Sequence, residues 1–289
     1  MVLHLVVQMH TLMNIINPFF IYGHARIMKL DQQTILLTGA SSGIGAELAR
    51  QLAGRGCRLI LIARREALLK QLVAELPGGA ERCQVMPCDL ADPEAVADLC
   101  ARIQASGITL DGMILNAGVS GRFAVRAMDL ALMRRQFEVN FWGAVQFISA
   151  FMPHFLQQRR GFIAVTSSLA GYRGMPAAAT YSAAKAALTR FVESLRIDCQ
   201  RSGVHLAVIS PGFVRTPMTE NSTFVRPFMI GAPQAARIIL HGLEQEKYEI
   251  RFPMPMVALA RIGRMLPERL YLRIMKDRRK PAAADGQQF

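Results

Sequence analysis

The sequence has few cysteines, and their arrangement does not suggest a structural role. The five cysteines are scattered along the chain, and no CxxC pair occurs. Secreted folds held by disulfides use paired cysteines in even numbers, so this pattern excludes that class and is typical of a reduced intracellular protein. The six histidines form no HExxH motif or similar cluster. The sequence therefore predicts no metal site.

The sequence also lacks an uninterrupted apolar run that could span a membrane. Residues 1–27 are rich in apolar side chains, but histidine, asparagine, glutamine and proline interrupt them. A spanning helix needs about 20 mostly apolar residues, and a signal peptide needs a basic start and a small-residue cleavage site. Residues 1–33 are interpreted as an N-terminal extension, either a start assigned too far upstream or a weak membrane-associating arm. We expect a cytoplasmic protein, with possible peripheral contact at the inner face of a membrane.

Acidic residues are few compared with basic ones. The chain has 21 Asp and Glu against 34 Lys and Arg, which gives a net charge of +13. Such a surplus suggests an anionic partner: nucleic acid, a membrane surface or a phosphorylated ligand. No stripe of aromatic and basic residues supports nucleic acid, so that partner is not expected. Many basic residues lie near the C-terminus: Arg251, Arg261, Arg264, Arg269, Arg273, Lys276, Arg278, Arg279 and Lys280.

Apolar residues make up 52% of the chain, enough for a sizeable core. From residue 34, short apolar runs typical of strands alternate with helix-like stretches. The predicted strands are 34–38, 58–63, 83–87, 111–116, 161–167, 204–210 and 249–252. The predicted helices are 46–55, 66–76, 93–106, 130–157, 183–201 and 233–246. This alternation predicts one α/β domain over 34–253, a Rossmann-like, doubly wound parallel sheet of about seven strands.

Three glycines lie between the first predicted strand and the first predicted helix, in the stretch LLTGASSGIGAEL. A helix N-terminus exposes unpaired N–H groups and a partial positive charge, which suits a phosphate. Gly39 would permit the tight turn, Gly43 the close approach of a pyrophosphate, and Gly45 the packing of the helix on the sheet. Their spacing is Gly-x-x-x-Gly-x-Gly, which differs from the common dinucleotide fingerprint Gly-x-Gly-x-x-Gly.

The end of the second predicted strand indicates which nucleotide binds. Proteins that bind NAD place a carboxylate there for the ribose 2′-hydroxyl. Here Ala63 occupies that position and Arg64 follows. An arginine can pair with a 2′-phosphate through charge-assisted hydrogen bonds, so the sequence favours NADP(H), with NAD less favoured. The alternative is a solvated pair of arginines at a helix start.

Tyr181 and Lys185 are four residues apart in TYSAAKAAL, which places them on one face of a helix. A nearby ammonium group stabilises tyrosinate and so lowers the pKa of the phenol. Such a tyrosine can exchange a proton with an alcohol at neutral pH.

These motifs do not occur alone, and together the chain resembles the short-chain dehydrogenase/reductase family over about residues 34–217. The residues that carry the resemblance follow the family's order: Thr38-Gly39-Ala40-Ser41-Ser42-Gly43-Ile44-Gly45, Asn116-Ala117-Gly118, Asn140, Ser168, Tyr181, Lys185, Pro211-Gly212 and Thr216. The resemblance implies an NADP-dependent oxidoreductase that interconverts a carbonyl and a secondary alcohol. The alternative is a regulatory protein that binds NADP without catalysis.

The resemblance also implies a role for each catalytic residue. Tyr181 would be the acid/base, and Ser168 would hydrogen-bond the substrate oxygen and stabilise its developing charge. Lys185 would bind the nicotinamide ribose and tune Tyr181. Asn140 would hold a water in the proton relay. Ser167 is the other serine at this strand end, but the spacing to Tyr181 favours Ser168.

The implied cofactor site draws on several loops. Asp89 would contact the adenine, Asn116 to Gly118 would pass along the middle of the cofactor, and Pro211, Gly212 and Thr216 would flank the nicotinamide. The full set is Gly39, Ser41, Ser42, Gly43, Ile44, Gly45, Arg64, Asp89, Leu90, Asn116, Ala117, Gly118, Tyr181, Lys185, Pro211, Gly212 and Thr216. Members that prefer NADP often carry a basic residue where Ser42 stands, which leaves selectivity to Arg64, together with Arg65.

Two later segments bear on the substrate and on partners. Met218, Phe224, Phe228 and Met229 make the expected substrate lid apolar, which predicts a hydrophobic carbonyl compound, unless they only pack the lid. The tail 254–289 is basic and amphipathic, with Leu270, Tyr271, Ile274 and Met275 on one face and Arg269, Arg273 and Lys276 opposite. Such a helix fits an anionic membrane surface, or it packs on its own domain or another subunit. A homodimer or homotetramer is expected.

Overall fold

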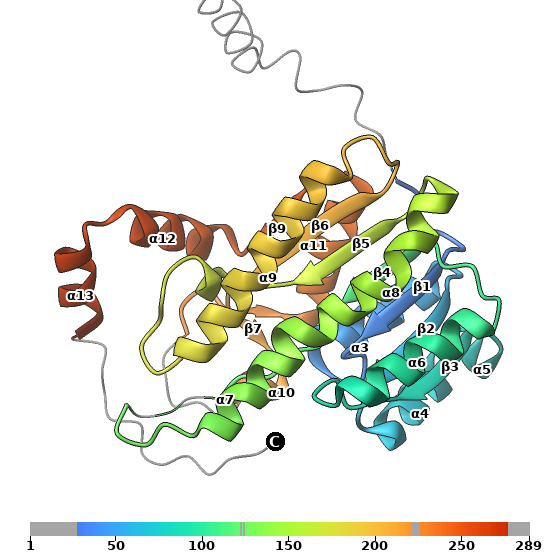
Figure 1. Cartoon of the computed structure of the whole chain (residues 1–289), viewed down its shortest axis with the longest axis horizontal. Helices are drawn as coiled ribbons and strands as arrows, with labels where there is room; N and C mark the ends of the chain where they lie inside the picture. Colours follow the sequence, from blue (N-terminus) through green and yellow to red (C-terminus); the bar gives the residue numbers. More distant parts are fainter. Residues whose placement is uncertain (1–27, 122, 124, 221–225, 277–289) are drawn as a thin grey trace, which may run out of the picture.

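The computed structural model describes residues 28–121, 123, 125–220 and 226–276. Seven parallel strands form one sheet in the order β3-β2-β1-β4-β5-β6-β9 (Figure 1). Their bounds are β1 Thr34–Thr38, β2 Arg58–Ala63, β3 Cys83–Pro87, β4 Gly112–Leu115, β5 Phe162–Thr166, β6 His205–Pro211 and β9 Glu249–Phe252. All seven strands expected from the sequence are present, which confirms the predicted Rossmann-like α/β class.

Helices cover both faces of the sheet, because its strands are apolar on both sides. Along β1, Ile35 and Leu37 point into one core and Leu36 into the other. The first core packs under α3 Gly43–Gly54, α4 Glu66–Glu75 and α11 Ala232–Glu244. The second packs under α6 Pro93–Ala105, α8 Gly143–Gln158 and α9 Ala179–Asp198.

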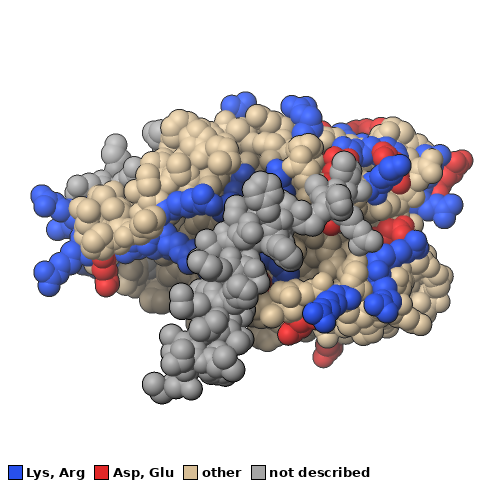
Figure 2. Space-filling model, turned by 90° about the horizontal axis from the view of Figure 1, so that it is seen from above, with Lys and Arg blue, Asp and Glu red and all other residues tan. Residues whose placement is uncertain are grey.

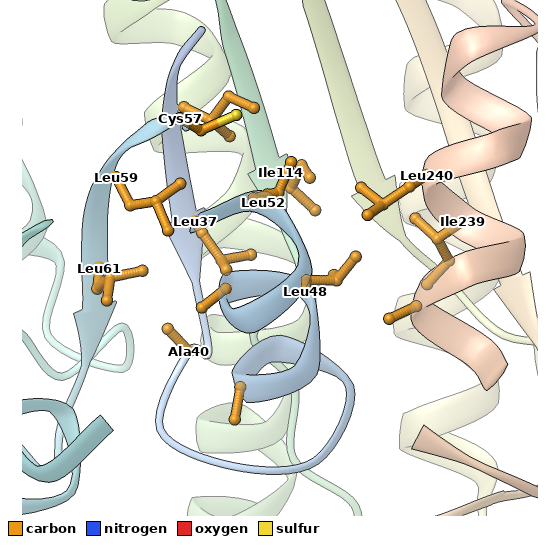
Figure 3. Packing of buried hydrophobic residues seen from close by; sticks show 14 of the residues in the cluster. Leu37, Ala40, Leu48, Leu52, Cys57, Leu59, Leu61, Ile114, Ile239 and Leu240 are labelled. Carbon is orange, nitrogen blue, oxygen red and sulfur yellow. The ribbon is translucent and has the colours of Figure 1, made fainter. Parts of the chain in front are cut away.

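The core beneath α3 fixes the position of the glycine loop. Leu48 and Leu52 of α3 lie between Leu37 of β1 and the α11 residues Ile239 and Leu240, and all are fully buried (Figure 3). Burying a side chain of this size contributes about 1.5–3 kcal/mol. The helix therefore lies in a fixed position on the sheet, and so does the loop at its N-terminus.

Helix boundaries differ from the sequence expectation at two places near the cleft. The stretch 130–157 is helical throughout, as expected, but it contains a π-helical turn, η1 Glu138–Trp142, between α7 Leu130–Phe137 and α8. Helix α9 begins at Ala179, four residues earlier than expected, so Tyr181 lies in its first turn. Apolar periodicity did not show either feature, because both depend on local packing around the site.

The remaining elements, apart from α5 at the amino end of β3, lie around the carboxyl ends of the strands. They are the helices α5 Gly79–Arg82, α10 Pro217–Glu220, α12 Met254–Met265 and α13 Glu268–Lys276, the 3-10 turn η2 Leu169–Gly171, and the short strands β7 Val214–Arg215 and β8 Ile230–Gly231. Helices α12 and α13 follow β9 and extend beyond the sheet (Figure 1). Among the described residues, no helix is long and apolar enough to span a membrane.

Candidate active site

A cleft of about 690 Å³ opens at the carboxyl ends of the strands. In a doubly wound sheet this is where ligands bind, beside the point at which the strand order reverses, here between β1 and β4. All but two of the catalytic and cofactor-binding residues expected from the sequence line the cleft. The exceptions are Gly45 and Asn140, which lie behind its wall and shape it.

The three loop glycines are required by close contacts. Gly39 has φ +70°, and a Cβ there would lie 2.7 Å from the Cα of Ala117. Gly43 has φ +57°, and its Cβ would lie 2.9 Å from Cγ2 of Thr216. A Cβ on Gly45 would lie 2.1 Å from the carbonyl oxygen of Gly39. Gly45 therefore allows α3 to pack against its own loop, whereas the sequence had suggested packing against the sheet.

Arg65, rather than Arg64, makes the side-chain contacts at the end of β2. Its Nη2 donates to Oγ of Ser41 at 3.0 Å and to Oγ of Ser42 at 2.8 Å. Arg64 also lines the cleft, and its side chain is exposed. Two arginines and two hydroxyls thus lie together where a nucleotide's 2′ substituent is expected. The sequence named Arg65 only as a partner of Arg64, because which of two adjacent arginines turns inward depends on the tertiary loop.

Asp89, the expected adenine contact, is held by an arginine from α7. Its Oδ2 accepts from Arg135 Nη2 at 2.7 Å, and Oδ1 accepts from the N–H of Ala91 at 3.1 Å. Partial burial raises the pKa of this carboxyl, but the two hydrogen bonds and the Arg135 charge outweigh it and lower the pKa overall. Asp89 is therefore ionised at neutral pH and fixed in orientation.

Ser168 and Tyr181 face each other across the cleft. The Ser168 hydroxyl lies close enough to the Tyr181 phenol to lower its pKa, and Ser168 Oγ also accepts from the N–H of Ala170 at 3.1 Å. Ser167 instead donates to the main-chain oxygen of Lys185 at 2.8 Å and contacts Thr189 Oγ1 at 2.7 Å. Of the two serines, only Ser168 reaches the tyrosine, as the spacing in the sequence predicted.

Burial determines the ionisation of Tyr181 and Lys185. Enclosure raises the pKa of Tyr181, and the nearby Ser168 hydroxyl lowers it only in part. Lys185 is 2% exposed, and burial lowers its pKa to about 7. Its Nζ donates to the Thr166 oxygen at 2.7 Å and lies 5.8 Å from the centre of the Tyr181 ring. The expected lowering of the phenol pKa is thus outweighed here by desolvation, which disfavours both charged forms.

Asn140 lies in the π-helical turn and is almost completely buried. Its Nδ2 donates to the carbonyl oxygens of Val119 and Gln136, both at 2.8 Å, and Oδ1 accepts from the Val119 N–H at 3.2 Å. Both amide protons are therefore used, and one lone pair on Oδ1 is left for a water. A Cβ on Gly118 would lie 3.0 Å from this oxygen and 3.3 Å from Lys185 Nζ, so all three groups meet at one point.

Comparison with known proteins agrees with this geometry. The family model described as short chain dehydrogenase matches residues 33–224, more than half of the chain. This chain is a short-chain dehydrogenase/reductase. Its fold is the one that the resemblance implied.

Relatives and solved structures extend over most of the chain. An uncharacterized oxidoreductase of Myxococcus xanthus is 33% identical over 84% of this chain and 96% of its own length. An 11-beta-hydroxysteroid dehydrogenase of Pinus massoniana is 31% identical over 81% of this chain and 69% of its own. A short chain dehydrogenase of Burkholderia cenocepacia, solved in complex with NADP, is 26% identical with a TM-score of 0.73, covering 86% of this chain and 99% of that one.

Nine of the residues that line the cleft come from a segment that the sequence placed outside the domain. We call α12 and α13, Met254–Lys276, the cover helices. Their cleft-lining residues are Met256, Leu259, Ala260, Ile262, Gly263, Leu266, Tyr271, Ile274 and Met275. Of the lid residues that the sequence named, Met218 lines the cleft, and Phe228 is 53% exposed. Phe224 lies outside the described residues.

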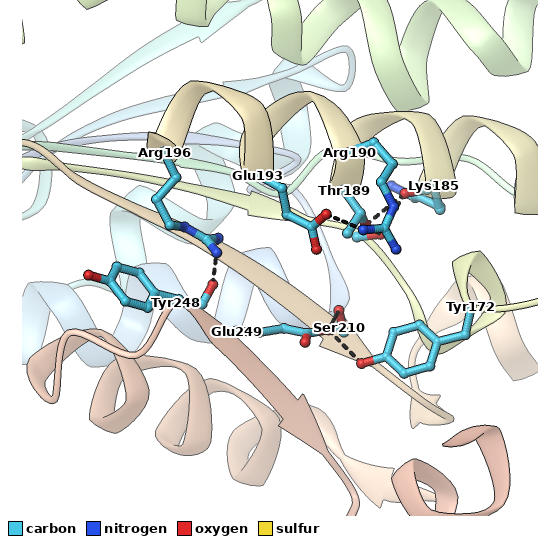
Figure 4. A network of polar contacts seen from close by, with 10 residues as sticks. Tyr172, Lys185, Thr189, Arg190, Glu193, Arg196, Ser210, Tyr248 and Glu249 are labelled. Carbon is cyan, nitrogen blue, oxygen red and sulfur yellow. Dashed lines mark hydrogen bonds and ion pairs between the residues drawn. The ribbon is translucent and has the colours of Figure 1, made fainter. Parts of the chain in front are cut away.

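Tyr172 is a further cleft residue that no sequence motif indicated. Its hydroxyl donates to Glu249 Oε1 at 2.5 Å, and Ser210 Oγ donates to the same oxygen at 2.9 Å (Figure 4). Burial, reinforced by the Glu249 charge, raises the pKa of Tyr172 to about 12. The network joins β6, β9 and the loop after Ser168, so Tyr172 presents a neutral, fixed ring to the cleft.

Proposed function

We propose that this short-chain dehydrogenase/reductase transfers hydride between NADP(H) and the carbonyl or secondary alcohol carbon of an apolar substrate. The observation that carries the proposal is the meeting of Ser168, Tyr181 and Lys185 at the floor of a cleft with an apolar wall. The polar groups lie at one end, beside the glycine loop. The apolar groups lie at the other, beneath the cover helices.

The residues at the glycine-loop end fit a dinucleotide. The helix N-terminus of α3 suits a diphosphate, and close backbone approach is possible because Gly39, Gly43 and Gly45 leave no room for a Cβ. Arg64 and Arg65 supply charge for a 2′-phosphate, and β2 offers no carboxylate for a 2′-hydroxyl. The NADP complex of the Burkholderia cenocepacia relative supports the same choice. A bound nicotinamide would supply or accept the hydride.

The chain's own residues would handle the proton. Tyr181 Oη donates a proton to the substrate oxygen in reduction and removes it in oxidation. Ser168 Oγ, close to that hydroxyl, donates to the substrate oxygen as charge develops there. Because its pKa is about 7, Lys185 is partly protonated at neutral pH. Its charged form places an ammonium group near Tyr181. Asn140 and Gly118 set the position of Lys185 and can bind a relay water through Oδ1.

An apolar carbonyl compound of fatty or steroid-like shape fits the wall that the cover helices build. The name of the Pinus massoniana relative, an 11-beta-hydroxysteroid dehydrogenase, is in keeping with that class. A non-catalytic NADP-binding regulator is the second candidate, and the complete set of Asn140, Ser168, Tyr181 and Lys185 disfavours it. A homodimer or homotetramer in the cytoplasm, in peripheral contact with an anionic membrane, stays part of the proposal.

Titration of the protein with NADPH and with NADH tests the cofactor choice. Binding is followed by the quenching of tryptophan fluorescence or by the fluorescence of the cofactor. NADPH should bind more tightly, and Arg65→Ala should weaken NADPH selectively by about 1.5–3 kcal/mol, since a charged hydrogen-bonding group is lost. Arg64→Ala measures how much Arg64 contributes to NADPH binding. Arg58→Ala, an exposed arginine at the start of β2, is the matched control. Equal or tighter NADH binding by the wild type contradicts the proposal.

A further inference from the structure

The cover helices expose many large apolar side chains, both on their outer face and at the mouth of the cleft. The exposed set is Met254, Leu259, Ile262, Met265, Leu270, Leu272 and Ile274, and Met265 is 84% exposed. Only Val257 and Tyr271 are buried in these two helices. Single exposed apolar residues are ordinary, but a contiguous group of this kind marks an interaction surface. The apolar face that the sequence suggested is divided, because Leu270 and Ile274 are exposed whereas Tyr271 is buried at the cleft.

The same surface is strongly basic. Arg261, Arg264, Arg269, Arg273 and Lys276 are all exposed on the cover helices, against one acidic residue, Glu268. None of these five cations forms an ion pair with a residue that the structure describes. Figure 2 shows Lys and Arg side chains at the left end of the molecule, where Figure 1 places α12 and α13.

The exposed apolar surface is continuous with the mouth of the cleft. Leu259, Ile262 and Ile274 are each at least 40% exposed and also line the cleft, and Met218 does so from the opposite wall. The opening is therefore rimmed by apolar side chains. Such a rim favours entry of an apolar substrate directly from a nonpolar phase. A path through water would first expose the apolar surface of the substrate to solvent.

The cover helices are docked, so the orientation of their outer face is fixed. Nη1 of Arg173 donates to the carbonyl oxygens of Gly263 and Leu266 at 2.5 and 2.7 Å, at the end of α12. The Arg173 guanidinium also lies 3.9 Å above the Tyr271 ring, whose hydroxyl donates to the Gly174 oxygen at 2.6 Å. These contacts hold the two helices on the loop that follows Ser168.

We propose that the outer face of α12 and α13 docks on an anionic lipid bilayer. Met254, Met265, Leu270 and Leu272 enter the interface, and the five cations contact lipid headgroups. The mouth of the cleft then opens against the bilayer, which is where an apolar substrate dissolves. The docking gives the proposed membrane contact a defined surface, and the delivery of substrate rests on the proposed hydride transfer, whereas the docking itself does not. A second copy of the chain is a poorer occupant, because an isologous contact would place five cations against the same five.

Co-sedimentation of the full chain with vesicles tests the docking. The chain should bind vesicles of equimolar phosphatidylcholine and phosphatidylserine at low salt, bind them less at about 0.15 M salt, and bind pure phosphatidylcholine weakly. Arg264→Glu should weaken binding at least about fivefold, since each basic residue near the surface adds about 1 kcal/mol. Met265→Glu should weaken it about tenfold, because an apolar contact becomes a buried charge.

Matched controls lie near the amino ends of the strands, away from the cover helices at the carboxyl ends. Arg58→Glu carries the same charge change, and Ile197→Glu places a charge on another exposed apolar residue, 68% exposed at the end of α9. Both controls should bind vesicles as the wild type does. Binding that is equally affected in variants and controls, or unaffected in all four, overturns the proposal. A change in oligomeric state with unchanged vesicle binding assigns the face to a chain–chain contact and also overturns it.

A label reports the depth of insertion directly. All five native cysteines are buried, so an environment-sensitive maleimide dye on Met265→Cys would be selective. Its emission should shift to the blue on anionic vesicles and be quenched by brominated lipid, whereas the dye on Ile197→Cys should not respond. NADPH titration of each variant reports on the proposed function separately. Intact NADPH binding without any lipid response defeats the docking alone, and lipid response without NADPH binding defeats the function alone.

Discussion

The floor and the cover of the cleft are built in opposite ways. At the floor, Asn140 and Lys185 are buried, and their polar atoms are bonded to the main chain of neighbouring elements. The cover helices bury one side chain each and are held by Arg173 and Tyr271. The catalytic residues, which need fixed positions, therefore lie in the part of the cleft with the most buried contacts. The residues that would select the substrate lie in the part with the fewest.

The largest expected effect comes from removing the proton donor at the floor. Tyr181→Phe should lower kcat on an accepted ketone by about 10²–10⁴-fold, because general acid catalysis is lost while the ring still packs. NADPH titration should be unchanged and serves as the control for folding. A variant that retains most of the wild-type turnover would mean that the proton comes from another group.

The next largest effect concerns the glycine loop. A Cβ at residue 45 meets the Gly39 oxygen at 2.1 Å, so Gly45→Ala should cost about 1–3 kcal/mol of unfolding free energy and weaken NADPH binding. Gly54→Ala in the same helix is the control, since a Cβ there has nothing within 4 Å. It should be neutral or stabilising by up to about 1 kcal/mol. Equal effects in a urea titration would show that the close contact relaxes freely.

Lys185 predicts a pH dependence of stability. Its folded pKa is about 7, whereas an unfolded lysine titrates near 10.4. Between these values the unfolded chain binds more protons, so stability rises with pH, by at most about 1.4 kcal/mol per pH unit. Urea titrations from neutral pH to about pH 9.5 should show this rise for the wild type relative to Lys185→Met. Parallel curves for the two proteins would contradict the low pKa.

The smallest effect is expected at the cover. Tyr271→Phe removes the bond to the Gly174 oxygen but keeps the ring beneath Arg173, so the global loss should be about 1 kcal/mol or less. KM for a bulky apolar substrate should rise a few-fold while kcat changes little. Tyr248→Phe is the control, because Tyr248 also lies beneath an arginine, Arg196, at 4.7 Å. A fall in kcat alone would place Tyr271 in the chemistry instead of the cover.

The floor of the cleft could be predicted from the sequence, and the cover could not. The seven strands were predictable because they depend on local periodicity, and the glycine loop, Ser168 and Tyr181 because they follow the motif order of the family that the chain resembles. The cover was not, since the contact of Arg173 with Tyr271 joins residues far apart in the chain. The pKa of Lys185 was missed for a related reason. Its direction depends on burial by several elements, which no short motif records.

The π-helical turn at Glu138–Trp142 changes which residues share a face along the helix around it. A π-turn adds one residue to a helix, which rotates everything beyond it by about 100°. A helical wheel drawn through 130–158 without that correction assigns the wrong faces to one half. Deletion of one residue here would restore a regular helix and carry Asn140 away from Gly118. The site therefore depends on an exact residue count along this stretch, independent of which side chains the other positions hold.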